Sequence, residues 1–495
     1  MKATSAQAGH ATFLRSCPSC KKGVSRMSGK IIGGWFSPHP PIIIPAVGQG
    51  EEQLAAATVS SMQQAAKAMA ELQPDTVIVC GPHGPLFADS FTVEAEPVLR
   101  GSFAAFGAKD EQITVAVDLD LTAAILRECE AKELPLAGLT TRLKQRFRLT
   151  AQLDHGALVP LWFLQAASEG ELPPVVLVNM SGLPLLEHYA LGVAIQQAVQ
   201  ASGKRVAIIG SGDLSHCLSD EAPGGFHHDA HHFDAAVAEL LHSQQVQNLP
   251  ALEELASVAG ECGLRPLAVF LGCFEGMTGQ YQVLSYEAPW GVGYLVATRQ
   301  VEAGIGHSYL DAFLAERQGA IDRQRAGESQ PVQLARSIVE SYVETGQLPN
   351  QLPLLSPSLP ARAGVFVTIY KHGQLRGCIG TTEATRPTLG EEIAQNAVSA
   401  AFNDPRFDPI AKDELPYLIY SVDVLGQAEE INDEQELDPK IYGVIVERGD
   451  KRGLLLPDLP GIDTAEAQVT LAKRKAGIGS GREVTLYRFR VTRHH

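Results

Sequence analysis

The sequence lacks several features that would place a protein in a broad class at once. No apolar run reaches the roughly 18 residues of a membrane-spanning helix, and residues 1–26 contain no apolar segment typical of a secretory signal. Positively charged residues are fewer than negatively charged ones: 40 Lys and Arg against 56 Asp and Glu give a net charge of −16. This balance argues against nucleic acid or an anionic membrane surface as a partner.

Cysteine is also sparse. Eight cysteines scattered over 495 residues do not form the dense framework of a disulfide-stabilised secreted domain, so we expect a reducing, cytoplasmic environment. Two of them form the pair Cys17 and Cys20, but structural zinc sites are typically four-coordinate, and one such pair is weak evidence for zinc. Residues 1–26 are interpreted as either a disordered tail or an over-extended start.

What the sequence does contain is a long alternation of strand-like and helix-like segments. A chain of this length exceeds one hydrophobic core, so we expect more than one domain. Over 27–300, short apolar runs alternate with segments of helical periodicity, which predicts an α/β domain with a mostly parallel sheet covered by helices. The predicted strands are 31–36, 76–80, 112–118, 174–180, 205–210, 282–287 and 293–297; the predicted helices are 51–72, 121–132, 157–167, 185–201, 233–242 and 264–274.

Near residue 300 this alternation ends. Helices are predicted over 309–321, 332–344 and 389–401, and strands over 364–370, 375–379, 417–425, 442–447 and 484–490. The first two of these strands flank a short polar turn, which predicts a hairpin. The pattern indicates an independent C-terminal α+β domain over 305–495.

Four histidines in the first domain stand in polar strings rich in Pro, Gly or Asp: His39, His83, His155 and His216. Two of these strings follow predicted strands directly, and a third follows one within a few residues. Because the carboxyl ends of parallel strands meet at one edge of a sheet, the fold can gather these imidazoles around one metal ion or substrate. Neutral imidazole is the commonest ligand for iron and zinc in proteins.

The third ligand of such a site has two candidates. Two imidazoles and one carboxylate form the facial arrangement of non-haem Fe(II) oxygenases, and Glu261 offers the carboxylate beside His39 and His83. The alternative is Cys262, whose thiolate would bias the site away from oxygen chemistry.

Two further histidines are then left for acid–base or outer-shell work. They are His155 and His216, and Asp213 precedes His216 closely enough to orient it. Four more histidines lie within 226–234, where a helix is predicted to begin; we interpret them as a solvated edge of the crevice, not as the main metal site. Arg265 is either a contact for an anionic substrate or a helix-start ion pair.

Together these strings resemble the class III extradiol dioxygenase superfamily, which includes the large subunit of protocatechuate 4,5-dioxygenase and the Memo proteins. The matching segments are 38–41, 82–85, 154–156, 212–216, 261–263 and 286–294. The resemblance implies Fe(II) held by His39, His83 and Glu261, with His216 as the acid–base residue near the substrate and O₂ and His155 beside it. It also implies cleavage of a catechol-type aromatic ring with one O₂.

Memo proteins carry a cysteine where the dioxygenases use glutamate. Both residue types stand side by side here, so the resemblance leaves Glu261 and Cys262 as alternative ligands and zinc as an alternative to iron. It also leaves an alternative function, that of a Memo-like metal-binding or regulatory protein without turnover.

In the second domain, the string that runs from Leu375 to Gly380 is the most distinctive. Cys378 is either a thiol made reactive by the neighbouring Arg376 or a small residue buried in a strand. Over 305–492 the chain resembles the AMMECR-type domain family, which implies a candidate cleft around Arg376, Cys378 and Glu383. The pairing of the two domains resembles a bacterial system with a radical-SAM protein, which implies such a partner, and related domains often form homodimers.

Overall fold

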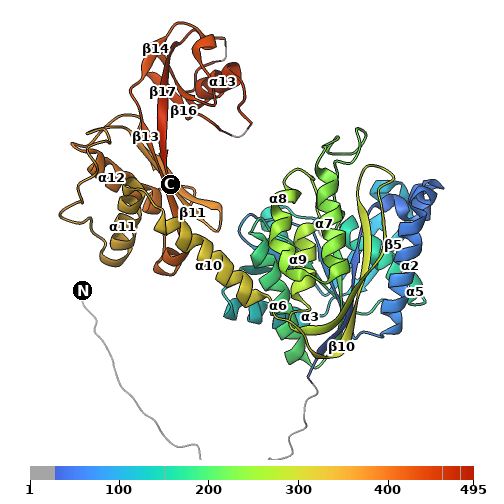
Figure 1. Cartoon of the computed structure of the whole chain (residues 1–495). Coiled ribbons are helices and arrows are strands. Elements are labelled where there is room, and N and C mark those ends of the chain that lie inside the picture. Colours follow the sequence, from blue (N-terminus) through green and yellow to red (C-terminus); the bar gives the residue numbers. More distant parts are fainter. Residues whose placement is uncertain (1–27, 151, 460, 480) are drawn as a thin grey trace, which may run out of the picture. The chain divides into compact units, whose positions relative to one another are not determined.

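The computed structural model describes residues 28–150, 152–459, 461–479 and 481–495. The expected tail and the pair Cys17 and Cys20 lie outside the described residues. The chain forms two compact units, of which unit 1 ends at Leu310 and unit 2 begins at Asp311 (Figure 1). In the described part of the chain, no helix has the length and apolar character needed to cross a bilayer.

Unit 1 is built on an eight-stranded mixed sheet whose centre is parallel. The central strands lie in the order β7 (Val175–Asn179), β2 (Thr76–Gly81), β8 (Arg205–Ser211) and β1 (Lys30–Ser37). Their residues are almost all buried, since helices cover both faces of the sheet, and this explains their continuous apolar runs.

The edges of this sheet contain the antiparallel pairs. At one edge β10 (Tyr294–Ile305) pairs antiparallel with β1, and β9 (Met277–Glu287) pairs with β10. At the other, β3 (Phe91–Glu94) runs antiparallel to β7, and β6 (Leu136–Leu139) runs parallel to β3. The first unit is therefore an α/β fold, as the sequence predicted.

One predicted strand lies outside this sheet. β5 (Ala108–Ala116) pairs with β4 (Val98–Phe103) in a separate two-stranded sheet. Buried and exposed residues alternate along β4 and along the second half of β5, which is typical of a hairpin with one face in solvent. A strand of that kind does not suit the centre of a sheet covered on both sides.

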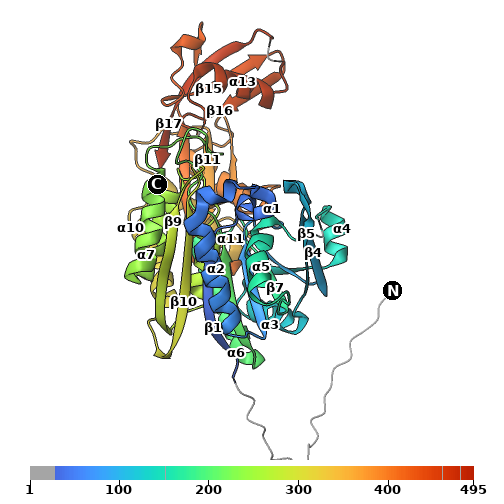
Figure 2. The same ribbon diagram turned by 90° about the vertical axis from the view of Figure 1, so that its right-hand side faces the viewer.

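Helices cover both faces of the main sheet. One face carries α3 (Leu119–Ala131), α6 (Leu185–Ser202) and α9 (Leu264–Gly272), and the other carries α2 (Ala56–Glu71) and α5 (His155–Ala167), which lie side by side in Figure 2. The shorter or peripheral helices are α1 (Pro45–Gly48), α4 (Thr141–Phe147), α7 (Ala230–Ser243) and α8 (Leu252–Ala256). Along β1, Trp35 packs into the core under α2 and α5, whereas Phe36 contacts Phe270 of α9, as the two-residue period of a strand requires.

Unit 2 is an α+β fold with an antiparallel sheet in the order β12-β11-β13-β17-β15-β16. Its strands are β11 (Val365–Lys371), β12 (Gln374–Gly380), β13 (Leu418–Leu425), β14 (Glu429–Ile431), β15 (Tyr442–Arg448), β16 (Lys451–Leu455) and β17 (Thr485–His494). Its helices are α10 (Leu310–Ala326), α11 (Gln330–Thr345), α12 (Leu389–Phe402) and α13 (Ala465–Lys475). α11 and α12 pack against β11 and β13 around one apolar core, and the long β17 continues the sheet into a second core under α13.

Candidate metal centre

Three of the four histidine strings follow neighbouring parallel strands. His39 comes just after β1, His83 just after β2 and His216 in the segment after β8, which lies between β1 and β2 in the sheet. The carboxyl ends of these strands open onto the same edge, so the three imidazoles start close together. His155 reaches the same place as the first residue of α5.

The side chains converge on one point. The Nε2 atoms of His39 and His83 lie 2.8 Å apart, and the ring of His155 stacks on that of His83 with 4.2 Å between centroids. The Cys262 sulfur lies 3.6 Å from Nε2 of His39 and 3.8 Å from Nε2 of His216. Among the described residues, two sets of possible ligand atoms lie within 4.8 Å of one another: His39, His83 and Cys262, and Asp213, His216 and Cys262.

Glu261, the other candidate for the third ligand, belongs to neither set. Its carboxylate accepts a hydrogen bond of 2.6 Å from the backbone N–H of Leu264, at the start of α9. This contact satisfies one of the free N–H groups at a helix start. Glu261 therefore faces the helix, and the next residue, Cys262, faces the imidazoles.

Close backbone packing holds Cys262 in that position. A Cβ atom on Gly212 would lie 2.3 Å from the Cα of Gly263, and one on Gly263 would lie 2.7 Å from the carbonyl oxygen of Asp213. Only glycine allows two backbone segments to approach this closely. The backbone N–H of Asp213 then donates to the Cys262 sulfur over 3.3 Å.

Ser211, which the sequence did not mark as functional, sets the tautomer of His39. Its hydroxyl donates to the carbonyl oxygen of Gly156 over 2.5 Å, and so its oxygen accepts from Nδ1–H of His39 over 2.9 Å. With the proton on Nδ1, the Nε2 atom of His39 presents its lone pair toward His83 and Cys262. The only signal in the sequence was a serine at the end of an apolar strand.

Two aspartates hold the segment that carries His216. Asp213 accepts a 2.8 Å hydrogen bond from the backbone N–H of His39, and its carboxylate lies within 4.8 Å of the ligand atom of His216. Asp234 accepts from the backbone N–H of Ser215 over 2.8 Å and from the hydroxyl of Tyr286 over 2.7 Å. These contacts tie together the loop after β8, the start of α7 and the end of β9.

Burial keeps the imidazoles neutral. It lowers the pKa of His39 well below its ordinary value and that of His83 to about 3, and the neighbouring imidazoles add to both effects. Burial also lowers the pKa of His155, against the opposing charges of Asp154 and Asp213, and that of His216, against the charge of Asp213. Neutral imidazole is the form that binds metals, so these side chains are ready as ligands or as proton acceptors at neutral pH.

The pKa values of the Cys262 thiol and the Asp213 carboxyl are raised instead of lowered. Burial, helped by the charge of Asp213, raises the pKa of Cys262 well above its ordinary value. Burial also raises the pKa of Asp213 to about 6. A nearby cation would reverse the effect on the thiol, because metal coordination deprotonates it.

These donors fit a transition-metal ion. Given metal bonds of about 2.0–2.3 Å, the ligand atoms of one tetrahedral ion lie roughly 3–4 Å apart. The 3.6 Å between Cys262 and His39 is in this range, and the 2.8 Å between His39 and His83 is slightly shorter. Imidazole suits zinc, copper and iron, and a thiolate favours zinc and copper over ions that prefer oxygen.

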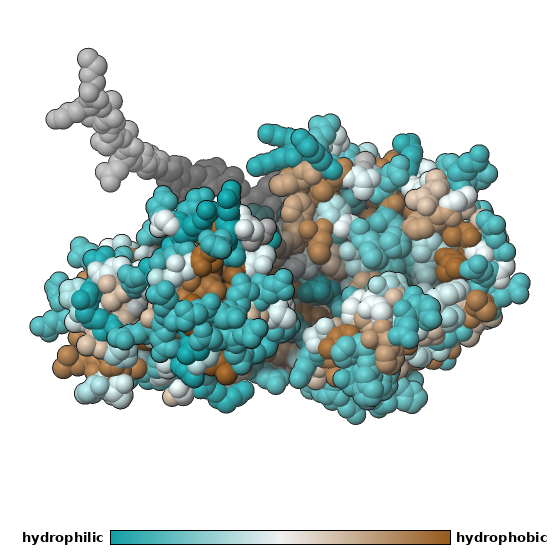
Figure 3. Space-filling model, turned by 90° about the horizontal axis from the view of Figure 1, so that it is seen from above, coloured by the Kyte–Doolittle hydropathy of each residue, from teal (hydrophilic) through white to brown (hydrophobic). Residues whose placement is uncertain are grey.

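The centre is open on one side. His39 is buried and His155 and His216 are half-buried; His83 is exposed as a whole residue, although its Nε2 faces His39 and is desolvated there. The ring of Phe106 lies 5.7 Å from that of His155 and is itself exposed. Figure 3 looks down on the end of unit 1 that the strands' carboxyl ends reach, where apolar patches are interspersed with polar surface. Arg265 is exposed in the first turn of α9.

In unit 2, the three residues of the expected cleft have different partners. Arg376 makes two 2.9 Å hydrogen bonds to the Glu414 carboxylate, and Glu383 forms an ion pair with Arg452. Cys378 lies in β12 and its sulfur accepts a hydrogen bond of 3.3 Å from the hydroxyl of Thr368.

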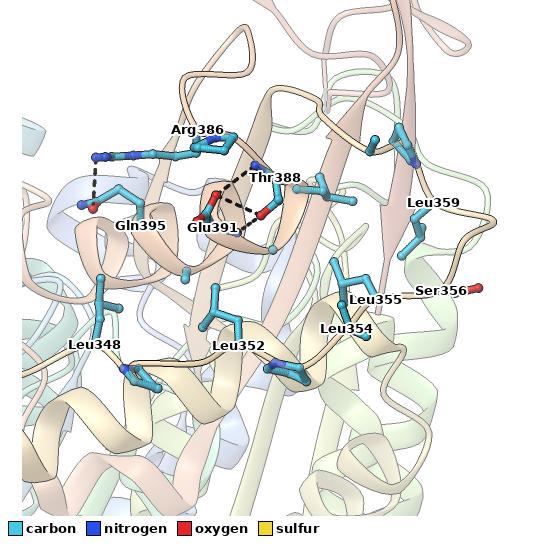
Figure 4. A pocket seen from close by; sticks show the side chains of 18 of the residues that line it. Leu348, Leu352, Leu354, Leu355, Ser356, Leu359, Arg386, Thr388, Glu391 and Gln395 are labelled. Atoms are coloured by element: carbon cyan, nitrogen blue, oxygen red, sulfur yellow. Dashed lines mark hydrogen bonds between the residues drawn. The ribbon is translucent and has the colours of Figure 1, made fainter.

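A cavity of about 730 Å³ in unit 2 lies elsewhere (Figure 4). Leucine and proline side chains of residues 348–360 line one side, and the start of α12 lines the other. Thr388 and Glu391 are joined there by the reciprocal hydrogen bonds of a helix cap. Arg376, Cys378 and Glu383 do not line this cavity.

Comparison with protein families matches both units. Residues 33–297 match the catalytic LigB subunit of aromatic ring-opening dioxygenase, and residues 332–494 match AMMECR1.

Similar proteins cover either nearly the whole chain or a part of it. Protein CA_C1420 of Clostridium acetobutylicum is 36% identical over 465 residues, which is 93% of this chain and 98% of that protein. A protein of Thermotoga maritima is 47% identical over 171 residues, 34% of this chain and 98% of its own length. Among solved structures, an uncharacterized Escherichia coli K12 protein, JW3007, is 14% identical with a TM-score of 0.37, and covers 54% of this chain and 99% of its own.

Proposed function

The chain belongs to the family of the catalytic LigB subunit of aromatic ring-opening dioxygenase, with an AMMECR1 domain following in the same chain, and we propose that unit 1 binds one transition-metal ion through His39, His83 and Cys262. The observation that carries the proposal is the pair of facing Nε2 atoms, 2.8 Å apart, with the Cys262 sulfur beside them. The hydrogen bond of His39 to Ser211 supports it, because metal-binding histidines usually donate their other ring N–H to a fixed oxygen.

Two imidazoles with a thiolate favour the Memo-like alternative, a metal-binding or regulatory protein. The contact of Glu261 with the backbone of Leu264 supports the thiolate over the carboxylate as third ligand. A thiolate places a soft, negatively charged donor in a position that a carboxylate takes in the Fe(II) oxygenases, and so favours zinc or copper.

Cobalt substitution tests this ligand set directly. The full chain is loaded with Co²⁺, and the thiolate-to-cobalt charge-transfer absorption in the near ultraviolet is recorded. We expect this band in the native chain and in Glu261→Gln, but not in Cys262→Ser. A band that survives Cys262→Ser and disappears in Glu261→Gln would contradict the thiolate assignment.

Ring cleavage of a catechol-type substrate is the second candidate, supported by the family match and by two imidazoles that the ligand set does not use. Fe(II), when bound, would supply a Lewis acid and a binding place for O₂ and the diol. His216 would take a proton from a substrate hydroxyl, since burial holds its imidazole neutral, and His155 would bond the same substrate from the stacked position beside His83.

Oxygen uptake separates the two candidates. The chain is loaded with Fe(II) without air and then mixed with aerated buffer and a panel of catechols. Uptake that disappears in His216→Ala, with iron still bound, supports ring cleavage. If no catechol stimulates uptake while iron stays bound, the metal-binding function stands alone.

We also propose a radical-SAM protein as a partner, because the pairing of the two domains resembles a system that contains one. Sedimentation of the chain with a purified radical-SAM protein of the same organism tests this. The same experiment on the chain alone reports whether it forms a homodimer.

A further inference from the structure

A second group of imidazoles lies at the start of α7, outside the proposed centre. Its members are His227, His228, His231 and His232, all exposed, and they surround the exposed Asp229. We propose that this group is a surface site that captures one divalent transition-metal ion, such as Zn²⁺ or Ni²⁺, through His228, His231 and His232, with the carboxylate of Asp229 as the hydrogen-bond partner of His228.

The hydrogen bonds of two of these rings leave the correct nitrogen free. Nδ1 of His228 lies 2.8 Å from the Asp229 carboxylate, whose oxygens accept hydrogen bonds, so Nδ1 carries the proton. Nδ1 of His231 donates to the backbone carbonyl of His228 over 2.9 Å. Both rings, when neutral, therefore present an Nε2 lone pair, and a ring N–H fixed by a carboxylate or carbonyl is the usual support of a metal-bound histidine.

The fourth ring is arranged differently and serves as an internal contrast. Nδ1 of His227 accepts a 3.2 Å hydrogen bond from the backbone N–H of Asp229, so the proton of the neutral ring is on Nε2. His227 is therefore left out of the ligand set.

The ligand rings are neighbours on the surface, and an ion would gather their nitrogens through rotation of these exposed side chains. Nε2 of His232 lies 3.9 Å from the Asp229 carboxylate, and the ring centroids of His231 and His232 are 4.0 Å apart. The rings of His228 and His231 are 6.3 Å apart. Exposed side chains change rotamer on a timescale of ps to ns, so rotation of the rings is fast enough to bring the three nitrogens around an arriving ion.

Support of the helix does not explain these histidines. A helix start carries partial positive charge and favours anions, so it offers no favourable interaction to the four imidazoles that gather at that end of α7. A bound metal ion meets the same unfavourable field, but the negative charge of Asp229 lies next to it. Imidazole selects zinc, nickel and copper over magnesium and calcium.

The test uses the full chain in a background that lacks the buried centre. His39→Ala with His83→Ala removes two ligands of that centre, and the set of Asp213, His216 and Cys262 stays in every protein compared. This protein is titrated separately with Zn²⁺ and Ni²⁺ by calorimetry. We expect it to bind one ion more than the same protein carrying His228→Gln, His231→Gln and His232→Gln. Cys17, Cys20 and the C-terminal pair His494 and His495 are present in both proteins, so the difference excludes them.

His242→Gln in the same background is the matched control, because His242 is an exposed histidine in the last turn of α7. We expect its stoichiometry to be unchanged. Retention of the untagged proteins on an immobilised Ni²⁺ column is the second measurement, and circular dichroism checks that α7 still folds. Equal stoichiometry and equal retention with and without the three histidines would overturn the proposal. Since the background lacks the buried centre, failure here is distinct from failure of the proposed function.

Discussion

His39 and His83 point their Nε2 atoms at each other across 2.8 Å, although 44 positions separate them in the sequence. Each lies just past the end of a parallel strand, and only β8 lies between those strands in the sheet. Two such nitrogens with no proton between them repel through their lone pairs, so the arrangement suits either a shared proton or a cation. The thiol of Cys262, 3.6 Å from His39, favours the cation.

Removing single ligands should rank their contributions to metal binding. We expect His39→Ala and Cys262→Ser each to weaken Zn²⁺ binding at least about tenfold, because the loss of an outer-shell partner alone has an effect of that size. Glu261→Gln should leave the affinity within about threefold, because the amide oxygen can still accept from Leu264. Competition with a chromophoric chelator measures all three. Similar losses for Glu261→Gln and Cys262→Ser would contradict the ligand set.

The metal affinity should rise with pH. Burial raises the pKa of the Cys262 thiol well above its ordinary value, so between pH 7 and 9 the metal-free site holds a proton that the ion must displace. The imidazoles are neutral throughout this range, and Asp213, with a pKa of about 6, is ionised. The logarithm of the affinity should therefore increase by about one for each pH unit. Calorimetry in buffers of different ionisation enthalpy counts the released proton, and a flat profile would argue against the thiolate.

Ser211→Ala should weaken metal binding without removing a ligand. Its hydroxyl holds the proton of His39 on Nδ1, and without it the ring is free to adopt the other tautomer or to turn. We expect a loss of about 10–100-fold, the usual size of an outer-shell change. Ser37→Ala is the matched control, because the hydroxyl of this buried strand-end serine donates to the carbonyl of Pro38. Equal losses in both variants would point to packing instead of tautomer control.

Much of the fold was predictable because its main signals are continuous. The central strands β1, β2, β7 and β8 are buried on both faces, and their apolar runs stand out. The four-residue strands β3 and β6 are too short to give a period, and α13 is largely polar, with few buried residues. β5 was predicted as a strand, but β4, which pairs with it in a hairpin across Ala104–Phe106, was not.

The residues of the site were likewise predictable only in part. The meeting of His39, His83 and His216 was predictable from one topological rule about strand ends, whereas His155 reaches the same place as the first residue of α5. The sequence did not predict whether Glu261 or Cys262 faces the imidazoles. These residues are adjacent, so which of them does depends on the local backbone direction, and that direction is set by the close packing of Gly212 against Gly263. Ser211 carried no distinguishing signal, since its role comes from two partners distant in sequence, His39 and Gly156.

Gly212→Ala should destabilise unit 1. Its new Cβ would lie 2.3 Å from the Cα of Gly263, which forces apart the two segments that bring Cys262 to the imidazoles. We expect a loss of about 2–3 kcal/mol in the free energy of unfolding and a parallel loss of metal binding. Urea unfolding followed by tryptophan fluorescence measures it, since Trp35, Trp162 and Trp290 all belong to unit 1. Gly81→Ala, whose Cβ would have 4.0 Å to its nearest neighbour, is the control and should cost under about 1 kcal/mol.

Acid should loosen unit 2 through Glu414. Burial alone would raise the pKa of this carboxyl, but hydrogen bonds from Arg376 and Lys371 outweigh it and lower the pKa to about 2. Because the folded value is below the unfolded one, the stabilisation is complete above about pH 5 and is lost as the pH falls toward 2.

The Glu414 carboxylate should contribute about 2 kcal/mol at pH 6 to the free energy of local opening of the strands around it. Glu414→Gln should remove both this contribution and its pH dependence. Hydrogen exchange of peptides from β11 and β12 follows it, since Lys371 and Arg376 lie on those strands. Glu383→Gln, which removes a carboxylate whose side chain is 67% exposed, is the control and should change little, because exposed ion pairs contribute about 0–1 kcal/mol. If the native chain and Glu414→Gln lose protection in parallel between pH 5 and 3, the carboxylate does not hold these strands.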